Sequence, residues 1–183
     1  MNKKIKSVFK SKKGSAVQMI IFAPFLLGLL ILTSVEITTN VKSNELNNDI
    51  TILMKRISRA KTFESAMTII DNNIGANKPL KNKDESKFFK ENLVFCVPKY
   101  EGGGNYNFDQ KISLKNDAVN FENYWANGNL LEIDFRRILI PEQYSSITVG
   151  AYKLSLFQNS VSIKRKVMIE GSNKRNEDVL RNG

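Results

Sequence analysis

The sequence predicts an α+β protein in which an N-terminal transmembrane helix continues into a long amphipathic helix packed on a small antiparallel β-sheet. Three observations predict this fold class. An uncharged, mostly apolar stretch runs from Gly14 to Val35. Apolar residues then recur at helical spacing from Leu46 to Ile74, and the chain after Leu93 alternates between apolar and polar residues as strands do. Helices followed by strands in separate parts of a chain are typical of the α+β class.

The uncharged stretch is long enough to cross a membrane. As an α-helix it measures about 33 Å, against about 30 Å for the hydrocarbon core of a bilayer. A cleaved secretory signal has a shorter apolar region, about 7–15 residues, followed by small residues at the cleavage site. The residues that follow here, 33–36, make a poor site of that kind. We therefore expect residues 15–36 to remain as a transmembrane helix, and an uncleaved or atypically cleaved signal is the alternative.

The charges on either side of this stretch predict its orientation. Glu36 and Glu45 lie beyond it, whereas residues 1–14 contain no acidic residue. The basic residues of this leader are Lys3, Lys4, Lys6, Lys10, Lys12 and Lys13. Because lysine is enriched on the cytoplasmic side of membrane helices, we expect a single-pass protein of the cell membrane with a cytoplasmic N-terminus and an extracytoplasmic C-terminal domain.

The same lysines explain most of the formal net charge of +10. Beyond the leader the chain has 22 basic residues against 18 acidic ones. A nucleic-acid-binding protein concentrates basic residues on a folded face, often with aromatic residues between them. Here the excess marks membrane topology and favours contact with anionic headgroups, so no nucleic-acid partner is expected.

The segment after the membrane helix is predicted to be one amphipathic helix over residues 37–75. Gly75 and then Pro79 supply its stop signal. Its apolar stripe is expected to pack on the chain's own domain, with a free coiled coil as the alternative. The stripe consists of Leu46, Ile50, Leu53, Ile57, Ala60, Phe63, Met67, Ile70 and Ile74.

Residues 76–171 are predicted to form an exported domain that contains the sheet, and residues 172–183 a polar tail. A short helix is expected over residues 84–92, with Asp84 as its N-cap. The Asn127-Gly128 pair lies between two strand-like runs and predicts a hairpin turn there. A second hairpin is predicted to turn near Asn159-Ser160.

The residue types exclude most catalytic chemistry. The chain has no histidine, which removes the usual base of serine and cysteine nucleophiles and the commonest metal ligand. Cys96 is the only cysteine, and its apolar neighbours predict a buried thiol rather than a nucleophile. Glu132 and Asp134 alternate along a strand and share one face, which is either a cation site or, by default, a solvated face. We expect no enzyme activity, no cofactor and no metal.

The stretch around Gly14 also resembles a known signal. A lysine-rich leader that ends in glycine, immediately before a membrane helix, is similar to the leader of type IV pilins and pseudopilins. The resemblance implies that a prepilin peptidase cuts between Gly14 and Ser15 on the cytoplasmic side and leaves the membrane helix attached. Within that helix, Gln18, Pro24 and Glu36 resemble the pattern of the TadE-like family of tight-adherence pilus systems, with Gln18 in the place of the family's first acidic residue.

This resemblance implies a structural role. The chain would be a minor pilin or pseudopilin of a tight-adherence-type pilus or a related envelope secretion assembly. Its partners would be the membrane, other pilin-like subunits and the secretion platform. Within the membrane, Gln18 would be a polar contact, Pro24 a tolerated kink, and Gly28 a point of close helix packing. The alternative is a membrane-tethered extracytoplasmic binding module with no filament role.

Overall fold

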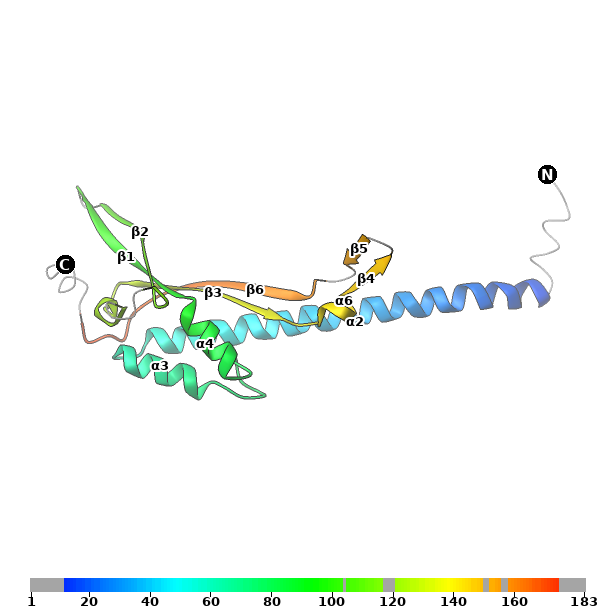
Figure 1. The fold of residues 1–183 in the computed structure, drawn as a ribbon, viewed down its shortest axis with the longest axis horizontal. Helices are drawn as coiled ribbons and strands as arrows, with labels where there is room; N and C mark the ends of the chain where they lie inside the picture. The colour runs from blue at the N-terminus through cyan, green and yellow to red at the C-terminus, as the bar shows by residue number, and fades with distance from the viewer. Residues whose placement is uncertain (1–11, 104, 117–120, 150–151, 156–157, 175–183) are drawn as a thin grey trace. The chain divides into compact units, whose positions relative to one another are not determined.

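A computed structural model of the chain describes residues 12–103, 105–116, 121–149, 152–155 and 158–174 (Figure 1). Contacts divide the chain into two compact units, Met1–Lys42 and Ser43–Gly183. Most of the predicted leader and the end of the predicted tail lie outside the described residues. The elements are α2 (Lys12–Ser58), α3 (Phe63–Asn72), α4 (Lys83–Glu91), β1 (Leu93–Gly102), β2 (Asn105–Ser113), η1 (Glu122–Tyr124), β3 (Leu130–Ile138), α6 (Glu142–Ser145), β4 (Ser146–Val149), β5 (Tyr152–Ser155) and β6 (Ser160–Met168).

Helix α2 contains the whole predicted transmembrane segment. It is helical over 47 residues, and Pro24 lies inside it. The predicted amphipathic helix over residues 37–75 is wrong as a single element, because α2 ends at Ser58 and a separate helix, α3, begins at Phe63. No glycine or proline marks this break, so the sequence pattern does not reveal it.

Distant segments of the chain fix the end of α2. The backbone N–H groups of Glu170 and Gly171 donate to the carbonyl oxygen of Ser58 at 2.9 and 3.1 Å. The indole Nε1 of Trp125 donates to the carbonyl oxygen of Ala60 at 3.0 Å. The last carbonyl groups of a helix have no partner within the helix. Here the C-terminal segment supplies partners for the carbonyl group of Ser58, the last residue of α2, and the indole binds the chain two residues after the helix ends.

Side-chain caps begin the two short helices. At α3, Thr62 Oγ1 accepts the N–H of Ser65 at 3.2 Å. At α4, Asn82 Oδ1 accepts the N–H of Glu85 at 2.9 Å. The predicted cap of α4 is therefore wrong, because Asp84 lies one residue inside the helix, in its first turn. An acidic residue there still interacts favourably with the positive end of the helix dipole.

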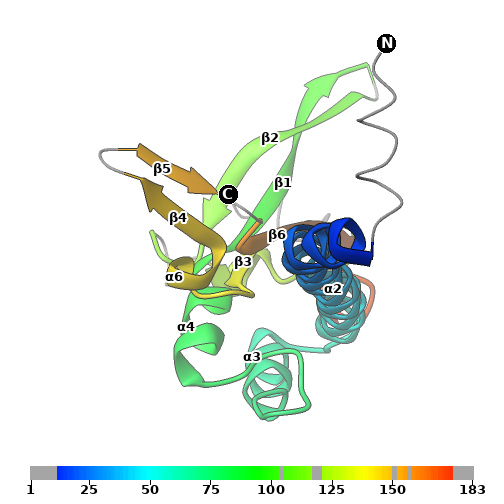
Figure 2. The same ribbon diagram turned by 90° about the vertical axis from the view of Figure 1, so that its right-hand side faces the viewer.

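The α+β class is confirmed, because the strands form a small antiparallel sheet in the order β2-β1-β3-β6 (Figure 2). In this register Phe95 pairs with Leu131, and Phe135 pairs with Ile163. All four side chains are buried. Strands β4 and β5 form a separate two-stranded sheet. The alternation of the sequence after Leu93 thus reports the sheet correctly, since successive residues of a strand face opposite sides.

The predicted hairpin at Asn127-Gly128 is wrong. Gly128 has a φ of +91° and does lie in a turn. Its N–H, however, donates at 3.0 Å to the carbonyl oxygen of the residue that follows β6. This is not the hydrogen bond of a hairpin between neighbouring strands. The segment before it forms the 3₁₀-helix η1. Phe121 and Trp125 flank that helix, and both side chains are buried.

The predicted second hairpin is also wrong. Strand β5 pairs with β4, whereas β6 pairs with β3 over its full length. The carbonyl oxygen of Asn159 accepts the N–H of Leu139 at 2.7 Å, which closes the junction at the end of β3 instead. The alternating pattern identified the strands, but it carries no information on which strands pair.

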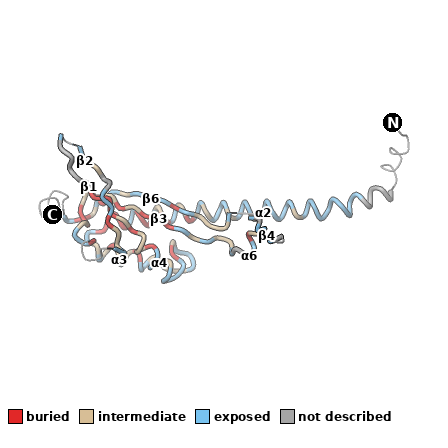
Figure 3. The backbone as a smooth tube through the Cα atoms, turned by 45° about the horizontal axis from the view of Figure 1, so that its top comes forward, coloured by how far each residue is buried: buried red, intermediate tan, exposed pale blue. Residues whose placement is uncertain are grey.

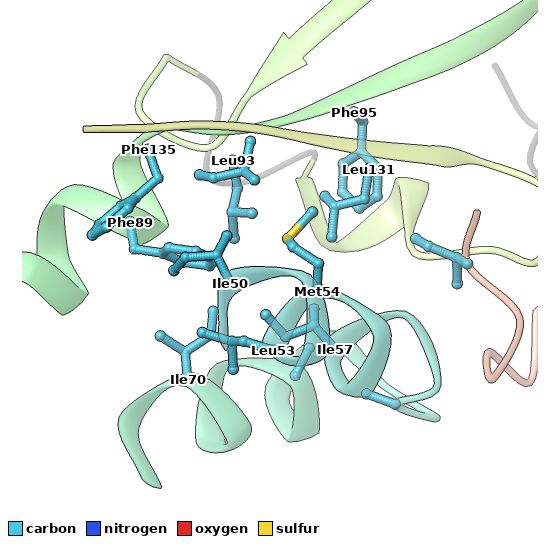
Figure 4. Packing of buried hydrophobic residues seen from close by; sticks show 14 of the residues in the cluster. Ile50, Leu53, Met54, Ile57, Ile70, Phe89, Leu93, Phe95, Leu131 and Phe135 are labelled. Carbon is cyan, nitrogen blue, oxygen red and sulfur yellow. The ribbon is translucent and has the colours of Figure 1, made fainter. Parts of the chain in front are cut away.

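A single buried hydrophobic cluster lies in the second unit. It includes side chains from α2, α3, α4 and the sheet, and Figure 4 shows several of them pointing toward one another. The labelled members are Ile50, Leu53, Met54, Ile57, Ile70, Phe89, Leu93, Phe95, Leu131 and Phe135. Phe95 further contacts Phe121 with ring centroids 4.3 Å apart. Aromatic contacts of this kind add to the stabilisation from buried area alone.

Candidate functional site: an exposed apolar segment of helix α2

The N-terminal part of α2 exposes large apolar side chains without interruption. Met19 is 70% exposed, Phe25 66% and Leu32 44%, and Figure 3 shows this part of the helix in the colour of exposed residues. Single exposed apolar residues are ordinary on protein surfaces, but contiguous apolar surface marks a site of interaction. The segment is therefore the first candidate for a functional surface.

This segment meets the requirements for a membrane span. Within Gln18–Ser58 an 18-residue window has a mean hydropathy of 2.3, and none of that window is buried. Among the described residues, α2 is the one helix long and apolar enough to cross a membrane. The part of α2 after Ser43 belongs to the second unit, where the stripe from Leu46 to Ile57 is buried.

Hydroxyl groups near the end of the apolar segment bond to the helix itself. Ser34 Oγ donates to the carbonyl oxygen of Leu30 at 2.7 Å, and Thr33 Oγ1 to the same oxygen at 3.0 Å. Thr38 and Thr39 bond in the same way one turn back, each at 2.8 Å. An unpaired polar group is costly in hydrocarbon, so internal bonds make these side chains compatible with lipid. These residues were not predicted as site residues, although serine and threonine at the end of an apolar run are visible in the sequence.

The five predicted site residues all lie on α2. Gly14 and Ser15 lie at its N-terminal end. Gln18 and Pro24 are exposed, and a Cβ atom added at Gly28 would meet nothing within 4 Å. The structure thus places these residues along one helix rather than in a pocket. Gly28 is open to approach by another backbone, which is the property that its predicted packing role requires.

A second polar cluster lies on the sheet around Cys96. Its thiol is buried and contacts Glu132 Oε2 at 3.5 Å, and Lys111 Nζ lies 3.1 Å from the same oxygen. Asp134 pairs with Lys164 at 3.3 Å on the same face of β3. The prediction that Cys96 is buried is confirmed. Glu132 and Asp134 are each paired with a lysine, as on a solvated face.

The surroundings of Cys96 favour its protonated form. Burial, with the hydrogen bond to Glu132, raises the pKa of Cys96 above its usual range. The hydrogen bond from Lys111 lowers the pKa of Glu132, against the opposing effect of burial. The thiolate is the nucleophilic form of cysteine, so a raised pKa disfavours covalent catalysis. In the described part of the chain no three Cys, Asp or Glu residues are grouped so that they could hold a metal ion.

A groove of about 680 Å³ lies between the end of α3, helix α4 and the residues that follow β2. This volume lies in the range of ligand-binding clefts. The half-buried side chains of Ile74 and Leu114 contribute apolar surface to it. Its polar lining consists of Asp71, Lys83, Ser86, Lys87, Lys90, Glu91 and Lys115. The sequence analysis missed this groove, because residues from three separate segments form it.

Comparisons with protein-family models, with curated proteins and with solved structures find no match to this chain. The class is therefore defined by the fold and by the exposed helix alone. The chain is an α+β protein with one N-terminal helix long and apolar enough to span a membrane, and with a small antiparallel four-stranded sheet.

Proposed function

We propose that this chain is a pilin-like structural protein, a minor pilin or pseudopilin of a tight-adherence-type pilus or related envelope secretion assembly. The observation that carries the proposal is helix α2 itself, which exposes large apolar side chains from Met19 to Leu32 and carries a buried stripe near its end. A single helix of this kind serves both as a membrane anchor and as part of a folded domain.

The N-terminus is cytoplasmic and the sheet domain extracytoplasmic in this proposal. The six lysines before Gly14 support that orientation, since positive residues are retained on the cytoplasmic side. The role of the protein is structural and not enzymatic. The raised pKa of Cys96 and the pairing of Glu132 and Asp134 with lysines agree with that role.

We further propose that the C-terminal part of α2 packs on the sheet in the working protein. Arg165 on β6 supports this, because its Nε donates to Thr51 Oγ1 on α2 at 2.9 Å. The same guanidinium donates to the side-chain oxygen of Asn47, one turn earlier on α2. These charge-assisted bonds, together with the buried stripe of α2, would hold the helix and the domain together.

Within the membrane the helix would pack against the helices of other pilin-like subunits. Gly28 permits close approach, because it presents no side chain there. Gln18 would accept a hydrogen bond from a neighbouring ammonium group but cannot neutralise it, which favours a minor component over the bulk filament subunit. Its partners would be the secretion platform, other pilin-like subunits and a prepilin peptidase.

The decisive experiment is mass measurement of the membrane-extracted chain from cells with an active prepilin peptidase. We expect a chain that begins at Ser15 and remains in the membrane, because the apolar run begins only after the cut. Gly14→Leu should keep the leader attached without changing membrane retention. The matched control, Gly28→Leu, makes the same change further along α2 and should leave cleavage intact.

An intact Met1 start in such cells would overturn the pilin-like proposal. The alternative, a membrane-tethered extracytoplasmic binding module with no filament role, would then be the better description. The groove lined by α4 favours this alternative, because its volume lies in the range of ligand-binding clefts.

A further inference from the structure

The groove between α3 and α4 carries positive charge that the domain itself does not neutralise. Lys90 Nζ lies 2.6 Å from Asp71 Oδ1, and Lys87 Nζ lies 4.0 Å from Glu91 Oε1. The other two lysines of the lining are exposed and have no ion-pair partner in the described part of the chain. They are Lys83 and Lys115. The lining therefore keeps an excess of two positive charges beside an apolar wall.

These two lysines stand at opposite ends of α4. Lys83 is the first residue of that helix. Lys115 follows Leu114, whose N–H donates at 3.2 Å to the carbonyl oxygen of Leu93. Leu93 lies two residues after the end of α4. From its first to its last residue α4 is about 12 Å long, so the two lysines reach the groove from well-separated positions. A ligand with two negative charges spaced along the groove satisfies both lysines without drawing their side chains together.

We propose that this groove binds an acidic peptide segment in the extended conformation. Its acidic side chains would stand at positions i and i+4, and an aliphatic side chain at position i+2. In an extended strand these three positions share one face, and four residues cover about 13 Å. The acids then meet Lys83 and Lys115, and the aliphatic side chain lies between them on Ile74 and Leu114. This inference concerns the second unit alone and holds whether or not the leader is cut.

The test measures peptide binding to the full chain held in phosphatidylcholine nanodiscs. The probe is a fluorescent, acetylated and amidated peptide, Glu-Thr-Leu-Thr-Glu, followed by anisotropy. We expect the double variant Lys83→Gln/Lys115→Gln to weaken binding at least tenfold. Lys55→Gln/Lys61→Gln removes the same charge from exposed positions outside the groove and should leave binding unchanged.

The peptide itself supplies the second half of the test. Replacing both glutamates with glutamine, or the leucine with threonine, should each weaken binding to the unchanged chain. Binding should also fall as salt rises, because exposed charges are screened. Thermal melting of each variant separates loss of the site from loss of the fold.

Three results would overturn the proposal. The first is equal binding of the acidic and the glutamine peptide, and the second is equal binding of the acidic peptide by the two double variants. The third is lysine-dependent binding of phosphatidylglycerol-containing vesicles with no binding of the peptide, which would assign the groove to a lipid surface instead.

Discussion

Cys96 shows how its surroundings determine the reactivity of a single side chain. The thiol is buried beside Glu132, and its pKa is raised. A raised pKa means that the folded protein favours the protonated form. The contribution of the protonated thiol to stability is therefore fully present below the usual thiol pKa of about 8.5. It is lost as the pH rises through the pKa of Cys96 in the folded protein.

We expect iodoacetamide to alkylate Cys96 slowly in the folded protein and rapidly once urea has unfolded it. The variant Cys96→Ala should lose less stability than the parent between neutral and alkaline pH, because it has no thiol to ionise. Alkylation is followed by mass measurement and stability by urea unfolding. Alkylation of the folded chain at the rate of a free thiol would contradict this account of the cluster.

At the scale of elements, α2 carries two different apolar surfaces along one helix. The large apolar side chains from Met19 to Leu32 are exposed, whereas the stripe near the end of the helix is buried. Ile57 belongs to the buried stripe and has an exposed fraction of 0%, and Ile52, on the same helix, is 49% exposed. The two positions form a matched pair for testing which face is core.

Ile57→Asp should destabilise the second unit by about 3 kcal/mol or more, because it buries an unpaired charge. Ile52→Asp should change the free energy of unfolding by less than about 0.5 kcal/mol, as surface substitutions usually do. Urea unfolding of the purified chain in neutral detergent measures both. If the two variants had the same free energy of unfolding in urea, the stripe would not be part of the core.

Elements that depend on local pattern could be predicted from the sequence, and those that depend on distant partners could not. The apolar run of α2, the buried stripe and the strands after Leu93 follow from residue periodicity. The break after Ser58 and the turn at Gly128 do not, because their hydrogen-bond partners come from the C-terminal segment. Of the candidate sites, the apolar segment was visible in the sequence, whereas the groove at α4 requires the tertiary fold.

At the scale of the whole molecule, Gly171 lies where two distant segments of the second unit are in close backbone contact. A Cβ atom added there would lie 2.0 Å from the carbonyl oxygen of Arg59. Contact at that distance is with backbone and cannot be relieved by turning a side chain. Glycine is therefore required at this position, because the two backbones lie too close together to leave room for a side chain.

Gly171→Ala should lower the melting temperature of the second unit, because the added methyl group overpacks the junction. The free energy of unfolding should fall by at least about 1–3 kcal/mol. Gly28→Ala is the matched control and should leave that transition unchanged, because nothing lies within 4 Å of the added Cβ. Thermal unfolding followed by circular dichroism or by tryptophan fluorescence measures both. An unchanged melting temperature for Gly171→Ala would show that the two backbones do not meet in solution.

The same junction determines how late in synthesis the fold of the second unit can be completed. The carbonyl oxygen of Ser58 receives its partners from Glu170 and Gly171, which the ribosome adds only after every strand of the sheet. Helix α2 emerges first and is ready to enter the membrane long before those residues exist. In the proposed topology, anchoring therefore precedes the completion of folding: the stripe of α2 lies outside the membrane and is not fully covered until the last strand has been translocated. During that interval the stripe is the surface that a chaperone would have to shield.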